Sequence, residues 1–152
     1  MRNAPETRRR AMRKTRVLFL CTHNSARSQM AEGLLRHLAG DRFEVVSAGT
    51  EATFVRPEAI EAMAELGADI SGQGSKALER YLGEPFDYVV TVCDDTNEAC
   101  PTFPGAKHRL HWSFRDPSLA AGGEEERLEV FRTVRDEILT RINDELLGRS
   151  KP

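Results

Sequence analysis

Short apolar runs alternate with longer segments of helical periodicity along this chain, and this alternation constrains the fold more than any other feature. The short runs are rich in β-branched and aromatic residues, which is typical of strands. The expected strands span residues 16–20, 43–47, 87–92 and 107–112. The expected helices span residues 27–39, 57–66, about 75–81 and 124–147. We therefore predict an α/β fold, a single-domain three-layer sandwich in which both faces of a four-stranded parallel sheet are covered.

The composition fits one globular domain and argues against several classes of function. The 152 residues are 39% hydrophobic and 30% charged, which is enough to build a buried core. A net charge of −2 argues against a protein that binds nucleic acid. Basic residues concentrate at the start, so we expect a disordered basic tail over 1–15 and a folded domain over 16–148. Because we find no membrane-spanning stretch and no secretory signal, we expect a cytoplasmic protein without a membrane partner.

The three cysteines do not form the even set that a secreted disulfide framework favours. In a cytosolic chain such cysteines are more often free thiols, and their placement decides whether they react. Cys21 follows the first expected strand and Cys93 follows the third. Because sites in parallel sheets lie beyond the carboxyl ends of the strands, both cysteines belong at the functional edge.

Cys21 and Arg27 enclose a five-residue loop between the first strand and the first helix. The backbone N–H groups of such a loop can converge with the helix N-terminus on one point and form an anion cradle. Arg27 adds a planar guanidinium that can bind a tetrahedral oxyanion through two hydrogen bonds. The predicted anion-binding loop consists of Thr22, His23, Asn24, Ser25, Ala26, Arg27 and Ser28.

The same loop favours the reactive form of Cys21. A helix N-terminus and a nearby cation stabilise a thiolate, so we expect Cys21 to act as a nucleophile beneath the bound anion. Ser28 can donate a hydrogen bond to this thiolate, and Asn24 suits an unusual backbone conformation. His23 is more typical of loop surface than of a catalyst. The alternative interpretation is a buried cysteine after a strand, with an exposed arginine nearby.

Asp116 is the best candidate for an acid that protonates the departing oxygen. It follows the fourth expected strand and therefore reaches the same edge of the sheet as Cys21. Pro117 restricts Asp116 to extended conformations. The alternative interpretation is an ordinary Asp-Pro turn.

At these residues the sequence resembles a known family. Cys-x5-Arg-Ser after the first strand, with Asp-Pro after the fourth, is similar to the low-molecular-weight tyrosine phosphatase fold. The run from Leu18 to Gly33 more closely resembles the thioredoxin-coupled arsenate reductases built on that fold. The further matching motifs are Ser47-Ala48-Gly49, Val90-Thr91-Val92-Cys93, Cys100-Pro101, His111-Trp112 and Asp116-Pro117. The resemblance covers residues 16 to about 147.

The resemblance implies reduction of arsenate to arsenite for arsenic detoxification, by a monomer that draws electrons from thioredoxin and holds no cofactor. Cys21 matches the nucleophile, which attacks arsenate held by the loop and Arg27, while Asp116 protonates the departing oxygen. Cys93 and Cys100 match the pair that carries the disulfide outward. Cys93 attacks Cys21 and releases arsenite, Cys100 attacks Cys93, and thioredoxin reduces the resulting disulfide.

This relay implies movement between its cysteines. Bridged cysteines have Cα atoms within about 7 Å, so Cys93 cannot meet Cys21 and Cys100 in one rigid geometry. We therefore expect the segment from Asp94 to Ala99 to be mobile, in the form of a short helix that unwinds.

The sequence departs from the family at a potassium site that some members have. Asn24, Glu32 and Ser47 match ligands of that ion, but the remaining two ligand positions fall on Gly74 and Lys76. A lysine cannot bind a cation, but its ammonium can replace one and pair with Glu32. We therefore predict no potassium activation and no metal, with loop support from Asn24, Ser28, Glu32, Ser47 and Lys76. Ala26 also replaces a further cysteine of many relatives, without effect on the relay.

Three rival functions remain open. The first is a low-molecular-weight protein tyrosine phosphatase, and weak phosphatase activity is expected from the shared loop. Against it, Ser118 replaces the usual aromatic residue after Asp-Pro, and Gln29 replaces the usual proline after Arg-Ser. The second is a redox-sensing or anion-binding module, which has no need of the acid Asp116. The third is a reductase that uses a low-molecular-weight thiol and does not need Cys93 and Cys100.

Overall fold

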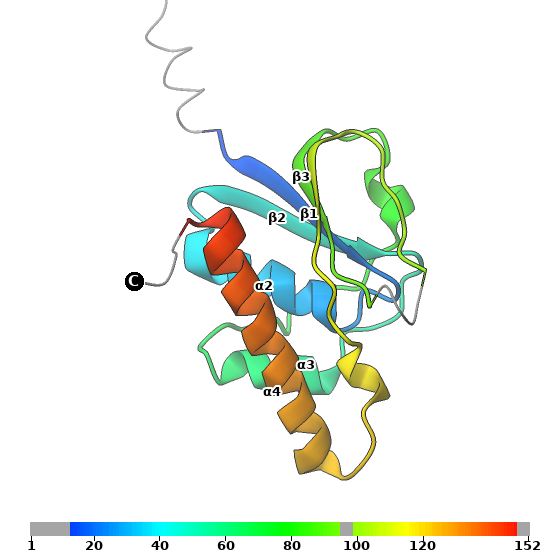
Figure 1. Cartoon of the computed structure of the whole chain (residues 1–152), viewed down its shortest axis with the longest axis vertical. Coiled ribbons are helices and arrows are strands. Elements are labelled where there is room, and N and C mark those ends of the chain that lie inside the picture. The colour runs from blue at the N-terminus through cyan, green and yellow to red at the C-terminus, as the bar shows by residue number, and fades with distance from the viewer. Residues whose placement is uncertain (1–12, 95–98, 149–152) are drawn as a thin grey trace, which may run out of the picture.

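The computed structural model describes residues 13–94 and 99–148 and contains the expected four-stranded parallel sheet. The strands lie in the order β2-β1-β3-β4, so β1 and β3 form the centre (Figure 1). Every neighbouring pair is parallel. The strands are β1 (Thr15–Cys21), β2 (Phe43–Gly49), β3 (Phe86–Thr91) and β4 (Ala106–His111).

Three α-helices lie on one face of this sheet (Figure 1) and contact one another. They are α2 (Arg27–Ala39), α3 (Pro57–Ala64) and α4 (Glu124–Arg141). Three shorter helical turns complete the described elements: η1 (Leu78–Tyr81), η2 (Pro117–Leu119) and η3 (Ile142–Leu146). The predicted α/β class is therefore confirmed.

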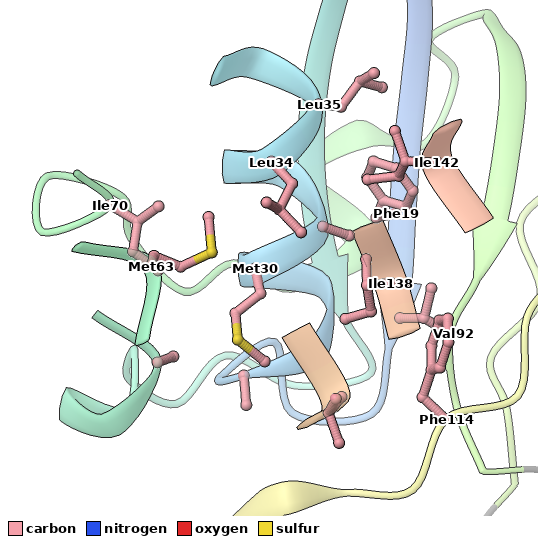
Figure 2. Close-up of a cluster of buried hydrophobic side chains, with 14 of the residues drawn as sticks. Phe19, Met30, Leu34, Leu35, Met63, Ile70, Val92, Phe114, Ile138 and Ile142 are labelled. Atoms are coloured by element: carbon pink, nitrogen blue, oxygen red, sulfur yellow. The ribbon is translucent and has the colours of Figure 1, made fainter. Parts of the chain in front are cut away.

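The helix-covered face of the sheet holds the larger hydrophobic core. Figure 2 shows Phe19 of β1 beside Ile138 of α4, with Met30 and Leu34 of α2 pointing into the same cluster. These four side chains are almost completely excluded from solvent. Because side chains alternate along a strand, Leu18 and Leu20 of β1 point to the opposite face.

That opposite face is covered by short segments in place of a long helix. Its smaller core joins strand residues to Tyr81 of η1 and to Phe103 of the chain before β4. Phe86 packs edge-on against both rings, with centroid distances of 6.2 Å to Tyr81 and 5.7 Å to Phe103. The expected helix around 75–81 is thus only a 3-10 turn over Leu78–Tyr81, and its Tyr81 ring packs against Phe86 in the smaller core.

Two further boundaries differ from the sequence prediction. The long C-terminal helix changes at Ile142 from α to π geometry, and Glu145 in the wider turn accepts a 3.0 Å hydrogen bond from the Trp112 indole. Thr15 belongs to β1, one residue before the expected domain start, because it pairs with β2 and its N–H bonds the Arg42 carbonyl at 3.0 Å. The rest of the expected basic tail lies outside the described residues, except for Arg13 and Lys14.

Over residues 13–94 and 99–148, no helix has the length and apolar character that crossing a membrane requires.

Candidate active site

The predicted anion loop lies at the carboxyl edge of the sheet, between the end of β1 and the start of α2. Cys21 is the last residue of β1 and Arg27 is the first residue of α2. Gly49, at the end of the neighbouring strand β2, lets the loop approach closely. A Cβ atom at Gly49 would lie only 2.7 Å from the Thr22 carbonyl oxygen and 2.8 Å from the Asn24 nitrogen.

The Cys21 sulfur lies at the base of this loop and is almost completely buried. The Asn24 backbone N–H donates to it at 3.3 Å, and the Ser28 hydroxyl lies 2.8 Å away. Asn24 has a φ of 51°, in the left-handed region that this residue type tolerates better than most. This backbone conformation turns its N–H inward toward the sulfur.

Arg27 and Asp116 come together from distant parts of the chain. The Arg27 side chain is only 2% exposed, and its guanidinium lies 3.6 Å from Asp116 Oδ2. Its other terminal nitrogen donates to the Phe114 carbonyl at 3.1 Å. A buried arginine is favourable only with such partners, so both groups hold the guanidinium at the loop.

Asp116 has the extended backbone that Pro117 imposes, with φ −84° and ψ 108°. Its Oδ1 accepts hydrogen bonds from the Ser118 backbone at 3.0 Å and from the Ser118 hydroxyl at 2.7 Å. Its Oδ2 is therefore the oxygen directed at Arg27. The carboxyl group caps η2 through one oxygen and faces the anion loop through the other.

A chain of buried hydrogen bonds connects Cys21 to Glu32. The Asn24 side-chain nitrogen donates to Ser28 at 2.7 Å and to Ser47 at 2.9 Å. The Ser47 hydroxyl in turn donates to Glu32 Oε1 at 2.6 Å. The five residues come from β1, the loop, α2 and β2, so this chain links Cys21 to the surrounding elements.

Lys76 lies at the far end of this chain, beside Glu32. Its side chain is only 11% exposed, and its Nζ lies 2.5 Å from the Gly74 carbonyl oxygen and 3.7 Å from Glu32 Oε1. Arg36 bonds the other Glu32 oxygen at 2.5 Å. Burial lowers the pKa of Lys76 below its ordinary value, and attraction to Glu32 only partly opposes this.

Sequence reasoning missed two glutamines in this part of the site. Gln29 is completely buried, and its side-chain nitrogen bonds Asn24 Oδ1 and the Gly74 carbonyl, each at 2.9 Å. Gln73 donates to Gln29 Oε1 at 2.7 Å. The sequence contains no signal for this pair, because 44 residues separate the two side chains.

All three cysteines are free thiols in this structure, and they differ in exposure. Cys21 and Cys93 are buried, whereas Cys100 is partly exposed and packs against the larger core. The expected mobility between Asp94 and Ala99 concerns residues 95–98, which lie outside the described residues.

A cavity of about 620 Å³ opens beside the anion loop. Thr22 and His23 of the loop and Asp116 are among the residues that line it. The rest of its lining is Asp94, Arg115, Leu119, Ala120 and Val130. His23 itself is largely exposed and lies 3.2 Å from Glu51. The cavity thus gives access to the loop, and it is larger than a tetrahedral oxyanion requires.

The described residues include no group of three or more His, Cys, Asp or Glu side chains that could hold a metal ion.

The fold and this loop together define a low-molecular-weight phosphatase-like class of protein. The family described as Low molecular weight phosphotyrosine protein phosphatase matches residues 16–148. The chain therefore belongs to this family.

Within the family, the chain is similar to proteins named arsenate reductase. One from Halalkalibacterium halodurans is 50% identical over 131 residues, which cover 86% of this chain and 94% of the relative. A solved structure, "An arsenate reductase in the phosphate binding state", has a TM-score of 0.75 and 35% identity, and the match covers 90% of this chain and 99% of that chain. The thioredoxin-dependent arsenate reductase Cg_ArsC1' of Corynebacterium glutamicum has a TM-score of 0.61 and 32% identity, over 91% of this chain and 65% of that one. These similarities confirm the resemblance seen in the sequence.

Proposed function

We propose that this chain is an arsenate reductase whose nucleophile is Cys21. The observation that carries the proposal is the pairing of two contacts made by residues of this loop: Cys21 Sγ lies 2.8 Å from the Ser28 hydroxyl, and the Arg27 guanidinium lies 3.6 Å from Asp116. Relatives of 50% identity that carry the name arsenate reductase support the choice of arsenate among tetrahedral oxyanions.

The first step forms a bond between sulfur and arsenic. Arsenate binds to the loop N–H groups and to Arg27, and the Cys21 thiolate attacks the arsenic atom. An As–O bond breaks, and Asp116 protonates the departing oxygen so that it leaves as water. Asp116 suits this role because Oδ1 is held by Ser118 while Oδ2 faces the loop.

The second step is a disulfide relay that reduces arsenic. The Cys93 thiolate attacks the Cys21 sulfur, the electron pair of the As–S bond leaves with arsenic, and arsenite departs. Cys100 then attacks Cys93, and thioredoxin reduces the Cys93–Cys100 disulfide. The named thioredoxin dependence of the Corynebacterium relative supports this donor. Because Cys93 is fully buried, the relay requires the chain around it to rearrange.

The relay is tested by arsenate-dependent NADPH oxidation in the presence of thioredoxin and thioredoxin reductase. We expect the unsubstituted protein to turn over repeatedly and Cys21→Ser to be inactive. Cys93→Ser should not turn over, and Cys100→Ser should yield at most about one arsenite per molecule, because its disulfide cannot be passed on. An unsubstituted protein without an arsenate-dependent signal would refute the proposed function.

A second function, phosphatase activity toward aromatic phosphate monoesters, is favoured by the cavity beside the loop. Its volume of about 620 Å³ and its apolar residues Leu119 and Val130 can hold an organic group beyond the anion. Because hydrolysis needs no disulfide, Cys93→Ser should retain p-nitrophenyl phosphate turnover while it loses arsenate reduction. Equal loss of both activities would show that Cys93 supports the fold of the site and not the relay.

We propose that the ammonium of Lys76 takes the place of a bound potassium ion in supporting the loop, and that the reaction needs no bound cofactor. The support comes from the burial of Lys76 and its distance of 3.7 Å from Glu32. Replacement of sodium by potassium at constant ionic strength should therefore leave arsenate turnover unchanged. A large increase with potassium would contradict this role for Lys76.

A further inference from the structure

Gln29 is enclosed at the junction of the anion loop and the chain segment 73–76. It lies in the first turn of α2, and its side chain is completely buried. Its Nε2 lies 2.9 Å from Asn24 Oδ1, 2.9 Å from the Gly74 carbonyl oxygen and 3.2 Å from the Asn24 carbonyl oxygen. One buried amide group therefore bonds both the backbone and the side chain of the loop residue with positive φ.

The orientation of each side-chain amide in this network follows from neighbouring groups that can only donate or only accept a hydrogen bond. The Lys76 backbone N–H can only donate, and it bonds Asn24 Oδ1 at 2.7 Å. The Gly74 carbonyl can only accept, so Gln29 must present its nitrogen there. Gln73 must likewise donate to the Gln29 carbonyl at 3.1 Å, because its oxygen faces the Arg36 guanidinium at 2.9 Å. The nitrogen and oxygen positions of all three amides are thus determined.

This orientation has a consequence for the proton of Ser28. With its oxygen facing Gln29 and Lys76, Asn24 presents its nitrogen to the hydroxyl oxygens of Ser28 and Ser47. Each hydroxyl accepts from Asn24 and must send its own hydrogen elsewhere. The Ser47 hydrogen goes to the Glu32 carboxylate, and the Ser28 hydrogen is left to point at the Cys21 sulfur. A donor to sulfur favours the thiolate over the thiol.

We propose that Gln29 is a positioning residue. The Lys76 N–H sets which way the Asn24 amide faces, and the Gln29 carboxamide, bonded to both the side chain and the carbonyl of Asn24, holds that amide in place beside Ser28, so that Ser28 donates its hydrogen to Cys21. The inference rests on the proposed function only in taking Cys21 as the nucleophile. Gln29 acts through two intervening side chains and does not touch the substrate. Without the Gln29 carboxamide, the Lys76 N–H still donates to Asn24 Oδ1. The hydrogen bonds from Gln29 to the side chain and to the carbonyl of Asn24 are lost, so the Asn24 amide and the loop backbone are no longer held by the same group.

The test measures how readily Cys21 forms a thiolate, without arsenate. In the full chain carrying Cys93→Ser and Cys100→Ser, the rate of alkylation by iodoacetamide is followed from pH 5 to 10, because only the thiolate reacts. Gln29→Met replaces the amide by an apolar group of similar length. The matched control is Gln73→Met. It removes the hydrogen bond from Gln73 to Gln29 Oε1 but keeps the Gln29 nitrogen bonded to Asn24.

We expect Gln29→Met to slow alkylation at pH 7 by about three- to tenfold and to move the midpoint of the pH profile upward, as weakening of a hydrogen bond to an ionised group requires. Gln73→Met should keep the parent profile. The proposal is wrong if folded Gln29→Met has the parent midpoint, or if both variants shift it equally. Because arsenate is absent, these outcomes are distinct from a failure of the proposed function.

A measurement on the unsubstituted chain decides the question if Gln29→Met does not fold. The side-chain amide hydrogens of Gln29 and Asn24, followed by NMR with ¹⁵N labelling, should exchange with water far more slowly than those of exposed glutamines. Exchange at the rate of an exposed amide would overturn the proposed network.

Discussion

Asn24 combines a positive φ with several buried side-chain hydrogen bonds in the predicted anion loop. Its φ of 51° is unfavourable by roughly 1 kcal/mol for a residue with a Cβ atom. Hydrogen bonds of its side chain to Ser28, Ser47, Gln29 and the Lys76 N–H offset this cost. The same contacts position the donor at Cys21, so backbone geometry and reactivity depend on one amide.

The burial of Lys76 predicts opposite effects of alkaline pH on stability and activity. Burial, with further contributions from Arg80 and Arg36, lowers its pKa below 10.5, although Glu32 raises it. Between the folded and unfolded pKa values the unfolded chain binds more protons, so the contribution of Lys76 to the unfolding free energy rises with pH. The support of its ammonium for Glu32 is lost over the same range. Arsenate kcat/KM should therefore fall toward pH 10 while this contribution to stability rises.

Variants of two lysines distinguish a fall in kcat/KM caused by deprotonation of Lys76 from one caused by other groups that lose a proton at alkaline pH. Lys76→Met should have lower kcat/KM than the parent at pH 7 and should lack the alkaline decline caused by Lys76. Lys107→Met removes an exposed lysine, 3.5 Å from Asp87, and should retain the parent profile. An unchanged alkaline decline in Lys76→Met would show that another group causes it.

At the scale of elements, the contact between α3 and α4 depends on charged groups as well as on apolar packing. The buried Arg135 of α4 donates at 2.8 Å to the Ala62 carbonyl near the end of α3, and at 2.9 Å to Glu65. Arg132 bonds both oxygens of the same carboxylate at 3.0 Å. Glu65, which caps α3, therefore ties the two helices together through two arginines.

These bonds predict a loss of stability in acid. The hydrogen bond from Arg132, followed by that from Arg135, lowers the pKa of Glu65 below 4.5. The contribution of Glu65 is therefore fully present above pH 4.5 and is lost as the pH falls through the lowered value. In Glu65→Gln the difference in melting temperature between pH 7 and pH 3 should be smaller than in the parent. Glu61→Gln, an exposed change on α3, should keep the parent difference, and an equal effect of both variants would contradict this assignment.

At the scale of the whole molecule, α4 is the element that closes the larger core. Its side chains Phe131, Val134 and Ile138 are almost completely buried, and Figure 2 shows Ile138 between the sheet and α2. The Trp112 indole, after β4, bonds Glu145 in the turn that continues α4. The helix therefore secures both the centre of the sheet and the segment that leads to Asp116.

A cavity at Ile138 should destabilise the whole domain. Ile138→Ala removes three buried carbon atoms and should lower the unfolding free energy by about 2–5 kcal/mol, as measured by urea denaturation. Glu137→Ala, on the exposed face of α4, should change it by less than about 0.5 kcal/mol. A loss below about 1 kcal/mol for Ile138→Ala would mean that the surrounding core collapses into the space.

Several features could be predicted from the sequence because they depend on neighbours along the chain. The strands and the three α-helices follow from local apolar patterns with small changes at their ends, as at Ile142, whereas the expected helix around 75–81 is only a 3-10 turn. Cys21, Asn24, Arg27 and Ser28 belong to one short segment that joins a strand to a helix, so the contacts among Cys21, Asn24 and Ser28 are a local property. Asp116 was found by its position after β4, since parallel strands bring their carboxyl ends to one edge.

The remaining features were decided only by the tertiary structure. The sequence cannot show that Gln29 meets Gln73, or that Lys76 donates its N–H to Asn24, because these contacts span 44 and 52 residues. They arise where the chain after α3 runs along the end of β2, with Gly49 bonded to the Lys76 carbonyl at 2.9 Å. Local patterns record which residues can form an element, whereas packing in three dimensions determines which buried polar groups become partners. The sequence by itself thus determined the loop and the position of Cys21 in it, and the fold determined the hydrogen-bond network around them.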